Sequence, residues 1–324
     1  MTQFRQAVRF FLTVTGFIAG IITVLVLYFT RFIIRPPRKA LWATPRHFGL
    51  AYEDVQFPAR DGVRLSGWFI PAAVSPPTSA PPAAEPRPAI VLVHGWPWNR
   101  LGTIAGNLLE DLPGTSPLEL LLLAHALRGA GYHVLMFDLR NHGQSAPAPP
   151  VTFGFQEAND LLGAVDFLQA RADVRPDQIG AVGFSMGANT ILFALPRTQA
   201  IKAAIAVQPT TPTVFKDGYA AYLLGPLGKL LGWVMEIGYP FFSGGMRLSA
   251  IDPVFAAGSA GAAPVLYVQS EQDAWGSPAD VARMVAATPH AVSPIFLPGT
   301  QRFGGYQYLL EHPEAALNFF QEYL

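Results

Sequence analysis

The chain has no cysteine and few charged residues. The absence of cysteine excludes a disulfide framework, a thiolate metal site and a cysteine nucleophile. Only 14% of the 324 residues are charged, and 22 basic residues balance 22 acidic ones. No basic block is long enough for a nucleic-acid footprint, so we expect no nucleic-acid partner. By contrast, 51% of the residues are hydrophobic, which is enough for one large domain with additional segments.

Charge is missing altogether from Phe10 to Thr30. The run is long enough to span a bilayer core of about 30 Å. Its length, and the lack of a small-residue cleavage motif after it, favour a retained anchor over a cleaved signal peptide or a buried core helix. Both flanks are basic, and the second is richer: Arg5 and Arg9, then Arg31, Arg35, Arg38 and Lys39. We therefore expect residues 1–40 to hold a transmembrane helix, in a single-pass membrane protein whose large domain, residues 41–324, is cytoplasmic.

The large domain begins with strand and loop signals. Extended runs on either side of an Asp-Gly turn, between Val55 and Ile70, predict a β-hairpin. Residues 71–88 are rich in proline, alanine and serine, and this composition predicts a surface loop.

After this loop, short apolar runs alternate with helical patterns such as Phe155–Ala170 and Ala188–Leu195. Apolar runs bounded by turn residues predict buried parallel strands. The runs are Ala89–Val93, Val134–Phe137, Ile179–Gly183, Ala203–Val207, Val265–Gln269 and Val292–Leu297. The alternation predicts an α/β fold, with a mainly parallel sheet and helices on both faces.

One connection, at about 210–263, is too long for a plain crossover between two strands. Its apolar, helical pattern predicts a lid over the carboxyl edge of the sheet. Such a lid could line an apolar substrate pocket, touch a membrane, or simply pack on itself.

The most specific motif is Gly183-Phe184-Ser185-Met186-Gly187, which has the form of a nucleophile elbow. An elbow turns sharply from strand to helix, so glycine is needed on both sides of the serine. The sequence around Ser185 predicts a strand before it and a helix after it. We therefore expect Ser185 to occupy a nucleophile elbow; whether it reacts is a separate question.

Two further groups follow from this placement. The loop His94-Gly95-Trp96 comes after the first parallel strand, which nominates the backbone amides of Trp96 and Met186 for an oxyanion hole. Asp273 follows another buried strand, where the acid of a triad must lie, with Glu271 as a weaker substitute. A loop aspartate that only caps the next helix is the alternative for Asp273.

The base is the missing part of the pattern. In the chain order Ser, Asp, His, only His290 and His312 follow Asp273. His290 precedes the last strand and is expected at the opposite edge of the sheet, so His312 is the candidate base, provided that the loop 298–311 folds back. His142 follows another strand end and is a second candidate, whereas His94 is expected to bond locally.

At this point the chain resembles the α/β-hydrolase superfamily over roughly Thr44 to Leu324. It is similar to membrane-anchored bacterial members related to serine aminopeptidases, monoacylglycerol lipases and dienelactone-hydrolase-like esterases. The matching segments are 61–68, His94-Gly95-Trp96, Asn99-Arg100, 137–140, His142-Gly143, 183–187 and Asp273.

The resemblance implies an eight-stranded sheet, Ser185 as nucleophile, Asp273 as acid, Trp96 and Met186 as oxyanion donors, and neither a metal nor an organic cofactor. Family members usually carry histidine in Gly-x-x-His-Phe-Gly, where this chain has Arg302. A guanidinium has no lone pair for the serine proton.

Two functions remain open from the sequence. The first is a membrane-tethered serine hydrolase, an esterase or lipase-like enzyme that forms an acyl-enzyme at Ser185 on a small apolar acyl substrate, with a base recruited from elsewhere. The second is a pseudohydrolase that binds a ligand or a partner without turnover. The oligomeric state does not follow from the sequence.

Overall fold

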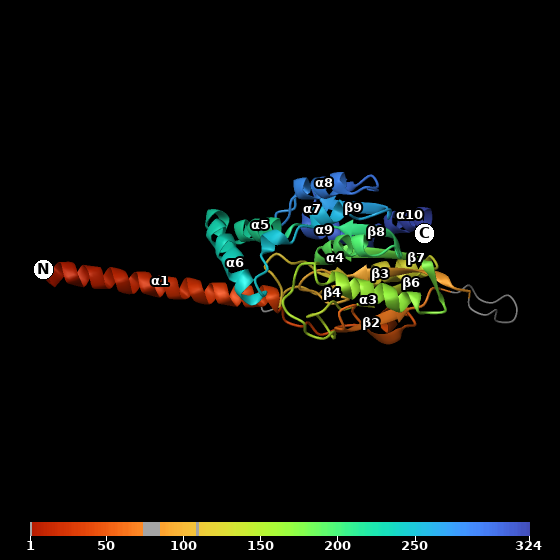
Figure 1. The fold of residues 1–324 in the computed structure, drawn as a ribbon, viewed down its shortest axis with the longest axis horizontal. Coiled ribbons are helices and arrows are strands. Elements are labelled where there is room, and N and C mark those ends of the chain that lie inside the picture. The colour runs from red at the N-terminus through yellow and green to blue at the C-terminus, as the bar shows by residue number, and fades with distance from the viewer. Residues whose placement is uncertain (1, 74–84, 108–109) are drawn as a thin grey trace.

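The computed structural model describes residues 2–73, 85–107 and 110–324, and is built around an eight-stranded sheet (Figure 1). The order of the strands is β1-β2-β6-β3-β7-β8-β9-β10, and β1 and β2 pair antiparallel at one edge. The remaining strands run parallel. Their bounds are β1 Glu53–Pro58, β2 Arg64–Ile70, β3 Arg87–Val93, β6 His133–Phe137, β7 Val174–Phe184, β8 Ile201–Val207, β9 Val265–Ser270 and β10 Ile295–Leu297. The predicted hairpin and parallel strands are confirmed.

Apolar residues face both sides of this sheet, as expected for parallel strands covered on both faces. On one face, residues such as Ile90 and Met136 pack with α2 (Leu121–Gly129), α9 (Arg302–Glu311) and α10 (Pro313–Tyr323). On the other face, their neighbours Val91 and Phe137 pack with helices of a second core. These helices are α3 Ala158–Gln169, α4 Met186–Ala194, α7 Pro253–Ala257 and α8 Pro278–Ala287.

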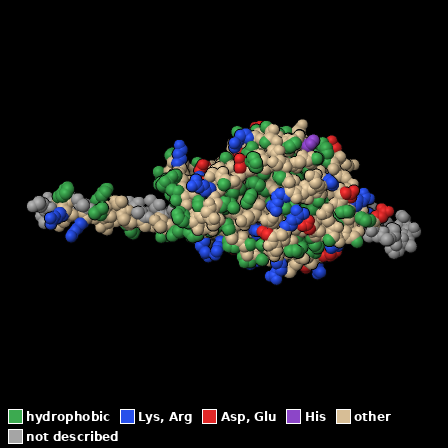
Figure 2. Space-filling model, viewed as in Figure 1, with side chains coloured by type: hydrophobic (Ala, Val, Ile, Leu, Met, Phe, Trp, Pro, Cys, Tyr) green, Lys and Arg blue, Asp and Glu red, His purple; other side chains and the backbone are tan. Residues whose placement is uncertain are grey.

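The long connection at about 210–263 is mostly helical. It contains α5 (Pro212–Leu224) and α6 (Gly228–Phe242), followed by the short α7. One side of α6 exposes large apolar residues, among them Leu230, Trp233 and Phe241. Figure 2 shows hydrophobic side chains gathered at this end of the molecule, where α5 and α6 lie close to the N-terminal helix. A helical insertion is therefore present, and its function as a lid remains a proposal.

The N-terminal helix α1 (Thr2–Ile34) projects from the domain as a rod (Figure 1). A membrane span needs about 20 consecutive, predominantly apolar residues in one helix. No helix among the residues that the structure describes is long and apolar enough to meet this requirement. The predicted transmembrane helix and single-pass membrane localisation are therefore wrong, and the membrane partner and cytoplasmic placement that were inferred from this helix lose their basis.

The last turn of α1 belongs to the domain. Ile33 and Ile34 are buried in its core, and the Val151 amide donates to the carbonyl oxygen of Ile34 at 3.1 Å. The segment after α1 is fixed by a buried ion pair between Lys39 and Asp111, with Thr103 also bonded to Lys39. Most of the predicted surface loop at 71–88 lies outside the described residues, because 74–84 are not described.

Candidate active site

Ser185 lies in a sharp turn between β7 and α4. Its backbone has φ 53° and ψ −115°, a conformation that side chains other than glycine rarely adopt. A Cβ at Gly183 would lie 2.3 Å from the Gly187 carbonyl oxygen, and one at Gly187 would lie 2.1 Å from the Val93 carbonyl oxygen. Both glycines are thus required sterically, and the turn has the geometry expected of a nucleophile elbow.

A small cavity lies beside Ser185, with about 20 Å³ open to the centre of a water molecule. Its lining includes Trp96 and Met186, the two residues expected to supply the oxyanion hole. Neither backbone amide donates a hydrogen bond within the described part of the chain. Met186 is the first residue of α4, where amides have no acceptor within the helix. Both amides are therefore available to an oxygen atom in the cavity.

Arg302, the first residue of α9, fills the space between Ser185 and Asp273. Its Nη1 donates to Asp273 Oδ2 at 2.6 Å, and its Nη2 donates to Ser185 Oγ at 3.1 Å and to the Gln208 carbonyl oxygen at 3.2 Å. The arginine is 3% exposed. The structure therefore brings Ser185, Asp273 and Arg302 together, and Arg302 takes the position between the other two that a catalytic histidine would occupy.

The charge of Arg302 is stable in this position. Burial lowers the pKa of its guanidinium, but the Asp273 carboxylate and Tyr306 together more than offset this, and the pKa lies above its ordinary value. A protonated guanidinium donates hydrogen bonds and accepts none. Arg302 can orient the Ser185 hydroxyl, but it cannot take its proton.

Asp273 is held by more than the arginine. Its Oδ1 accepts from the amides of Trp275 and Gly276, both at 2.9 Å. A Cβ at Gly276 would lie 2.5 Å from Asp273 Oδ2, so glycine is needed for this close approach.

Two residues of the site were not predicted from the sequence. Tyr306 lies one turn after Arg302 on α9; it is buried, and the guanidinium carbon of Arg302 lies over its ring, 5.4 Å from the ring centroid. Burial raises the pKa of this phenol to about 12, with the Arg302 charge acting in the opposite direction. Gln208 ties α9 to the sheet, because its Nε2 donates to Ser270 Oγ at 2.9 Å and to the Arg302 carbonyl oxygen at 2.5 Å. The spacing of Arg302 and Tyr306 by four residues is a signal that could have suggested Tyr306, had 302–311 been recognised as a helix.

The structure does not bring His312 to Ser185. Residues 302–311 form the helix α9 and not the expected loop, and about 1.5 Å of rise per residue puts His312 roughly 15 Å along it from Arg302. The His312 side chain is 53% exposed and its Nδ1 contacts Glu314 at 3.2 Å. His290 and Glu271 are exposed as well.

His94 and His142 are buried beside each other, with ring centroids 5.1 Å apart. His94 contacts the Gly95 carbonyl oxygen through Nδ1 and accepts from the Leu139 amide through Nε2. His142 contacts the Arg140 carbonyl oxygen at 2.8 Å, and its Nε2 has no partner within the described part of the chain. Burial lowers the pKa of His94 to about 4 and that of His142 to about 3. Both imidazoles are neutral at pH 7, and neither contacts Ser185.

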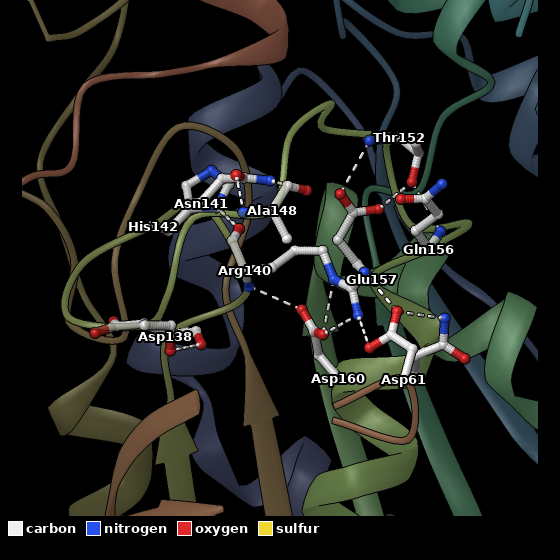
Figure 3. Close-up of polar contacts among 12 residues, drawn as sticks. Asp61, Asp138, Arg140, Asn141, His142, Ala148, Thr152, Gln156, Glu157 and Asp160 are labelled. Atoms are coloured by element: carbon white, nitrogen blue, oxygen red, sulfur yellow. Dashed lines mark hydrogen bonds and ion pairs between the residues drawn. The ribbon is translucent and has the colours of Figure 1, made fainter. Parts of the chain in front are cut away.

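A buried charge cluster supports the loop that carries His142 (Figure 3). Arg140 donates to Asp160 Oδ1 from Nε at 2.8 Å, and its Nη1 lies 2.7 Å from Asp61 Oδ2. Nearby, the Glu157 carboxylate accepts from the Thr152 hydroxyl at 2.7 Å and from the Gly154 amide at 2.9 Å. These bonds fix residues 152–154, so that Phe153 forms part of the wall beside Ser185.

A second, apolar cavity adjoins the first, with about 30 Å³ open to the centre of a water molecule. Trp96 and Phe215 line both cavities. The remaining walls come from the end of α1 (Phe32 and Ile33), from Leu112, and from α5 and α6. The insertion at 210–263 thus helps to close the space next to Ser185.

Comparison with known proteins agrees with this architecture. The family described as the alpha/beta hydrolase fold matches residues 88–234. An esterase of Pyrococcus furiosus, Pf2001, superposes with a TM-score of 0.64 over 90% of this chain and 98% of its own, at 21% identity. The chain therefore has the alpha/beta hydrolase fold, and the resemblance expected from its motifs is confirmed.

Curated relatives match part of the chain. The uncharacterized protein YfhR of Salmonella typhi is 32% identical over 162 residues, which are 49% of this chain and 44% of that protein. The polyketide transferase ATR5 of Stachybotrys chlorohalonatus is 27% identical over 164 residues, 50% of this chain and 46% of that protein. This chain thus spans about half the length of the curated relatives it matches.

Proposed function

We propose that this chain is a pseudohydrolase of the alpha/beta hydrolase fold, which binds a small acyl compound at Ser185 without turnover by a triad. The single observation that carries the proposal is the position of Arg302, whose guanidinium bonds both Asp273 and Ser185. An esterase among the neighbours of the same fold supports an acyl-type ligand.

The physical argument concerns one proton. Attack of Ser185 Oγ on an acyl carbon needs a base to take the hydroxyl proton and return it to the leaving group. Arg302 stays protonated beside Asp273, and the pKa of Tyr306 at about 12 keeps its phenol protonated too. Losing the base of a triad costs about 10⁴ to 10⁶ in turnover.

Slow ester hydrolysis at Ser185 is a second candidate, and a specific observation favours it. The elbow geometry is intact, and the amides of Trp96 and Met186 are free to bind an oxyanion. Such donors and binding alone retain about 10³ to 10⁴ of rate over the reaction in water.

The test is the hydrolysis of a short-chain activated ester by wild type, Ser185→Ala and Arg302→His. In the last variant, the imidazole could take the Ser185 proton as the acyl bond forms and give it to the leaving alcohol. We expect wild type to match Ser185→Ala, and Arg302→His to be faster by about 100-fold or more. A wild-type rate well above that of Ser185→Ala would reject the pseudohydrolase and favour the slow esterase.

A further inference from the structure

Two buried polar groups beside Ser185 lack a partner. Trp96 Nε1 and Thr210 Oγ1 make no hydrogen bond within the described part of the chain, although the residues are only 7% and 5% exposed. Buried polar groups are nearly always paired, so each exception calls for an explanation. Both residues line the small cavity that contains Ser185.

The small size of this cavity brings its polar groups together. A space of about 20 Å³ for the centre of a water molecule holds one or two waters. The indole N–H of Trp96, the hydroxyl of Thr210 and the free amides of Trp96 and Met186 belong to residues around this one space. All four can donate a hydrogen bond, so the complementary ligand group is one that only accepts.

A carboxylate is such a group, because its two oxygens offer about four acceptor sites and no donor. The amino end of α4, at Met186, adds a favourable electrostatic contribution for an anion. The charges of Arg302 and Asp273 offset each other in a direct ion pair, so no unpaired carboxylate opposes the ligand there.

The adjoining cavity indicates what is attached to this head group. It shares Trp96 and Phe215 with the first cavity, and its other walls are mostly apolar. At about 30 Å³ for the centre of a water molecule, it suits a short alkyl chain.

We propose that Trp96 Nε1 and Thr210 Oγ1 form a carboxylate subsite in the cavity beside Ser185, and that the ligand is a short-chain carboxylate. One carboxylate oxygen accepts from the amides of Trp96 and Met186, and the other accepts from the Trp96 indole and the Thr210 hydroxyl. The alkyl chain extends past Phe215 into the apolar cavity. The inference rests on the proposed function, since a bound carboxylate is a ligand that is not turned over.

The experiment is isothermal titration of the full chain with butyrate and hexanoate, and with the uncharged amides butyramide and hexanamide. We expect hexanoate to bind, and hexanamide to bind at least about ten-fold more weakly, because the amide loses the anionic oxygen. Thr210→Val should weaken hexanoate binding about ten-fold, whereas Thr210→Ser, which keeps the hydroxyl, should restore it. Trp96→Phe, which removes the N–H, should weaken it similarly.

Thr198→Val is the matched control, because Thr198 lies outside both cavities and should leave the dissociation constant unchanged. Equal binding of hexanoate and hexanamide, or unchanged binding in Thr210→Val, overturns the carboxylate subsite. A failure of hexanoate to bind wild type overturns it as well. If wild type nevertheless fails to hydrolyse esters and Arg302→His gains activity, the pseudohydrolase stands and only the subsite is lost.

Discussion

Two buried arginines in this molecule have different surroundings. Arg140 is bonded to two carboxylates, Asp160 and Asp61, in the cluster of Figure 3. Arg302 has one carboxylate, Asp273, and its remaining bonds go to the Ser185 hydroxyl and to a backbone carbonyl oxygen. Arg140 joins the loop after β6 to α3 and the β1–β2 turn, whereas Arg302 lies where a proton acceptor is needed. The comparison teaches that the position of an arginine, more than its burial or its ion pair, decides whether it bears on chemistry.

The largest effect is expected from Arg140→Met, which leaves Asp160 buried without its cation. Removing one partner of a buried pair costs about 3–5 kcal/mol. Denaturant unfolding of wild type and variant would measure the loss. A loss below about 1 kcal/mol would contradict the structural role given to the cluster.

The next largest effect is expected from acid, which should lower the free energy of unfolding through the region of Arg140. The reason is that His94 and His142 lie beside the loop that carries Arg140. Their pKa values fall from about 6.5 in the unfolded chain to about 4 and about 3 in the folded state. Their contribution to stability is complete above pH 6.5 and is lost as the pH falls through this window, since only the unfolded chain binds the protons.

Between pH 7 and 5 each imidazole should therefore lower the free energy of unfolding by about 2 kcal/mol. His142→Asn keeps a donor for the Arg140 carbonyl oxygen but does not titrate, so it should remove about half of this dependence. Unfolding curves at pH 7, 6 and 5 provide the measurement. An unchanged slope in the variant would mean that His142 does not resist protonation in the folded state.

Arg302→Met should lower the free energy of unfolding by about 1–3 kcal/mol, which is less than the loss expected for Arg140→Met. The reason is that Asp273 retains two backbone donors, the amides of Trp275 and Gly276, whereas the backbone donor to the Asp160 carboxylate is the single amide of Arg140. Asp61 also loses its cation in Arg140→Met, and this adds to the larger loss. Equal losses in the two variants would remove the distinction between the clusters.

The smallest effect is expected at Ser185. Ser185→Gly relieves the strain of φ 53° and should raise the free energy of unfolding by up to about 1 kcal/mol, less the lost bond to Arg302. Ser185→Ala is the matched control, because it loses the same hydroxyl and keeps the Cβ. If glycine is no more stable than alanine, the turn is not strained.

Much of the fold could be predicted because its signals are local. Each buried parallel strand shows as a short apolar run, and the glycines around Ser185 mark the elbow. The last strand and the segment after it were less accessible. Gly304 and Gly305 weaken the helical pattern of 302–311, so the sequence predicts a loop where the structure has a helix, and β10 covers only Ile295–Leu297. A Cβ at Gly305 would lie 2.1 Å from Gln208 Nε2, so glycine there permits the approach of α9 to the sheet.

The site divides in the same way. The chain order of Ser185, Asp273 and position 302 was enough to expect these residues together, and the structure brings them together. Tyr306 follows from its four-residue spacing to Arg302 only once 302–311 is known to be a helix, and the place of Gln208 depends on how α9 packs against β8 and β9. The membrane prediction rested on the uncharged run Phe10–Thr30 and its basic flanks. The helix that contains this run continues to Ile34, and its last residues, Ile33 and Ile34, belong to the domain core.

The last turn of α1 determines where the N-terminus can be truncated without disturbing the domain. Proline residues after the helix suggest a natural hinge, yet Phe32 packs edge-on against Trp96 with ring centroids 5.6 Å apart, and Ile33 and Ile34 lie in the core. The boundary between the projecting part of α1 and the domain therefore lies within the helix, before Phe32. A truncated protein that begins before Phe32 keeps Phe32 and Ile33 as part of the wall of the apolar cavity. One that begins at Pro36 loses both residues and exposes Trp96 to solvent.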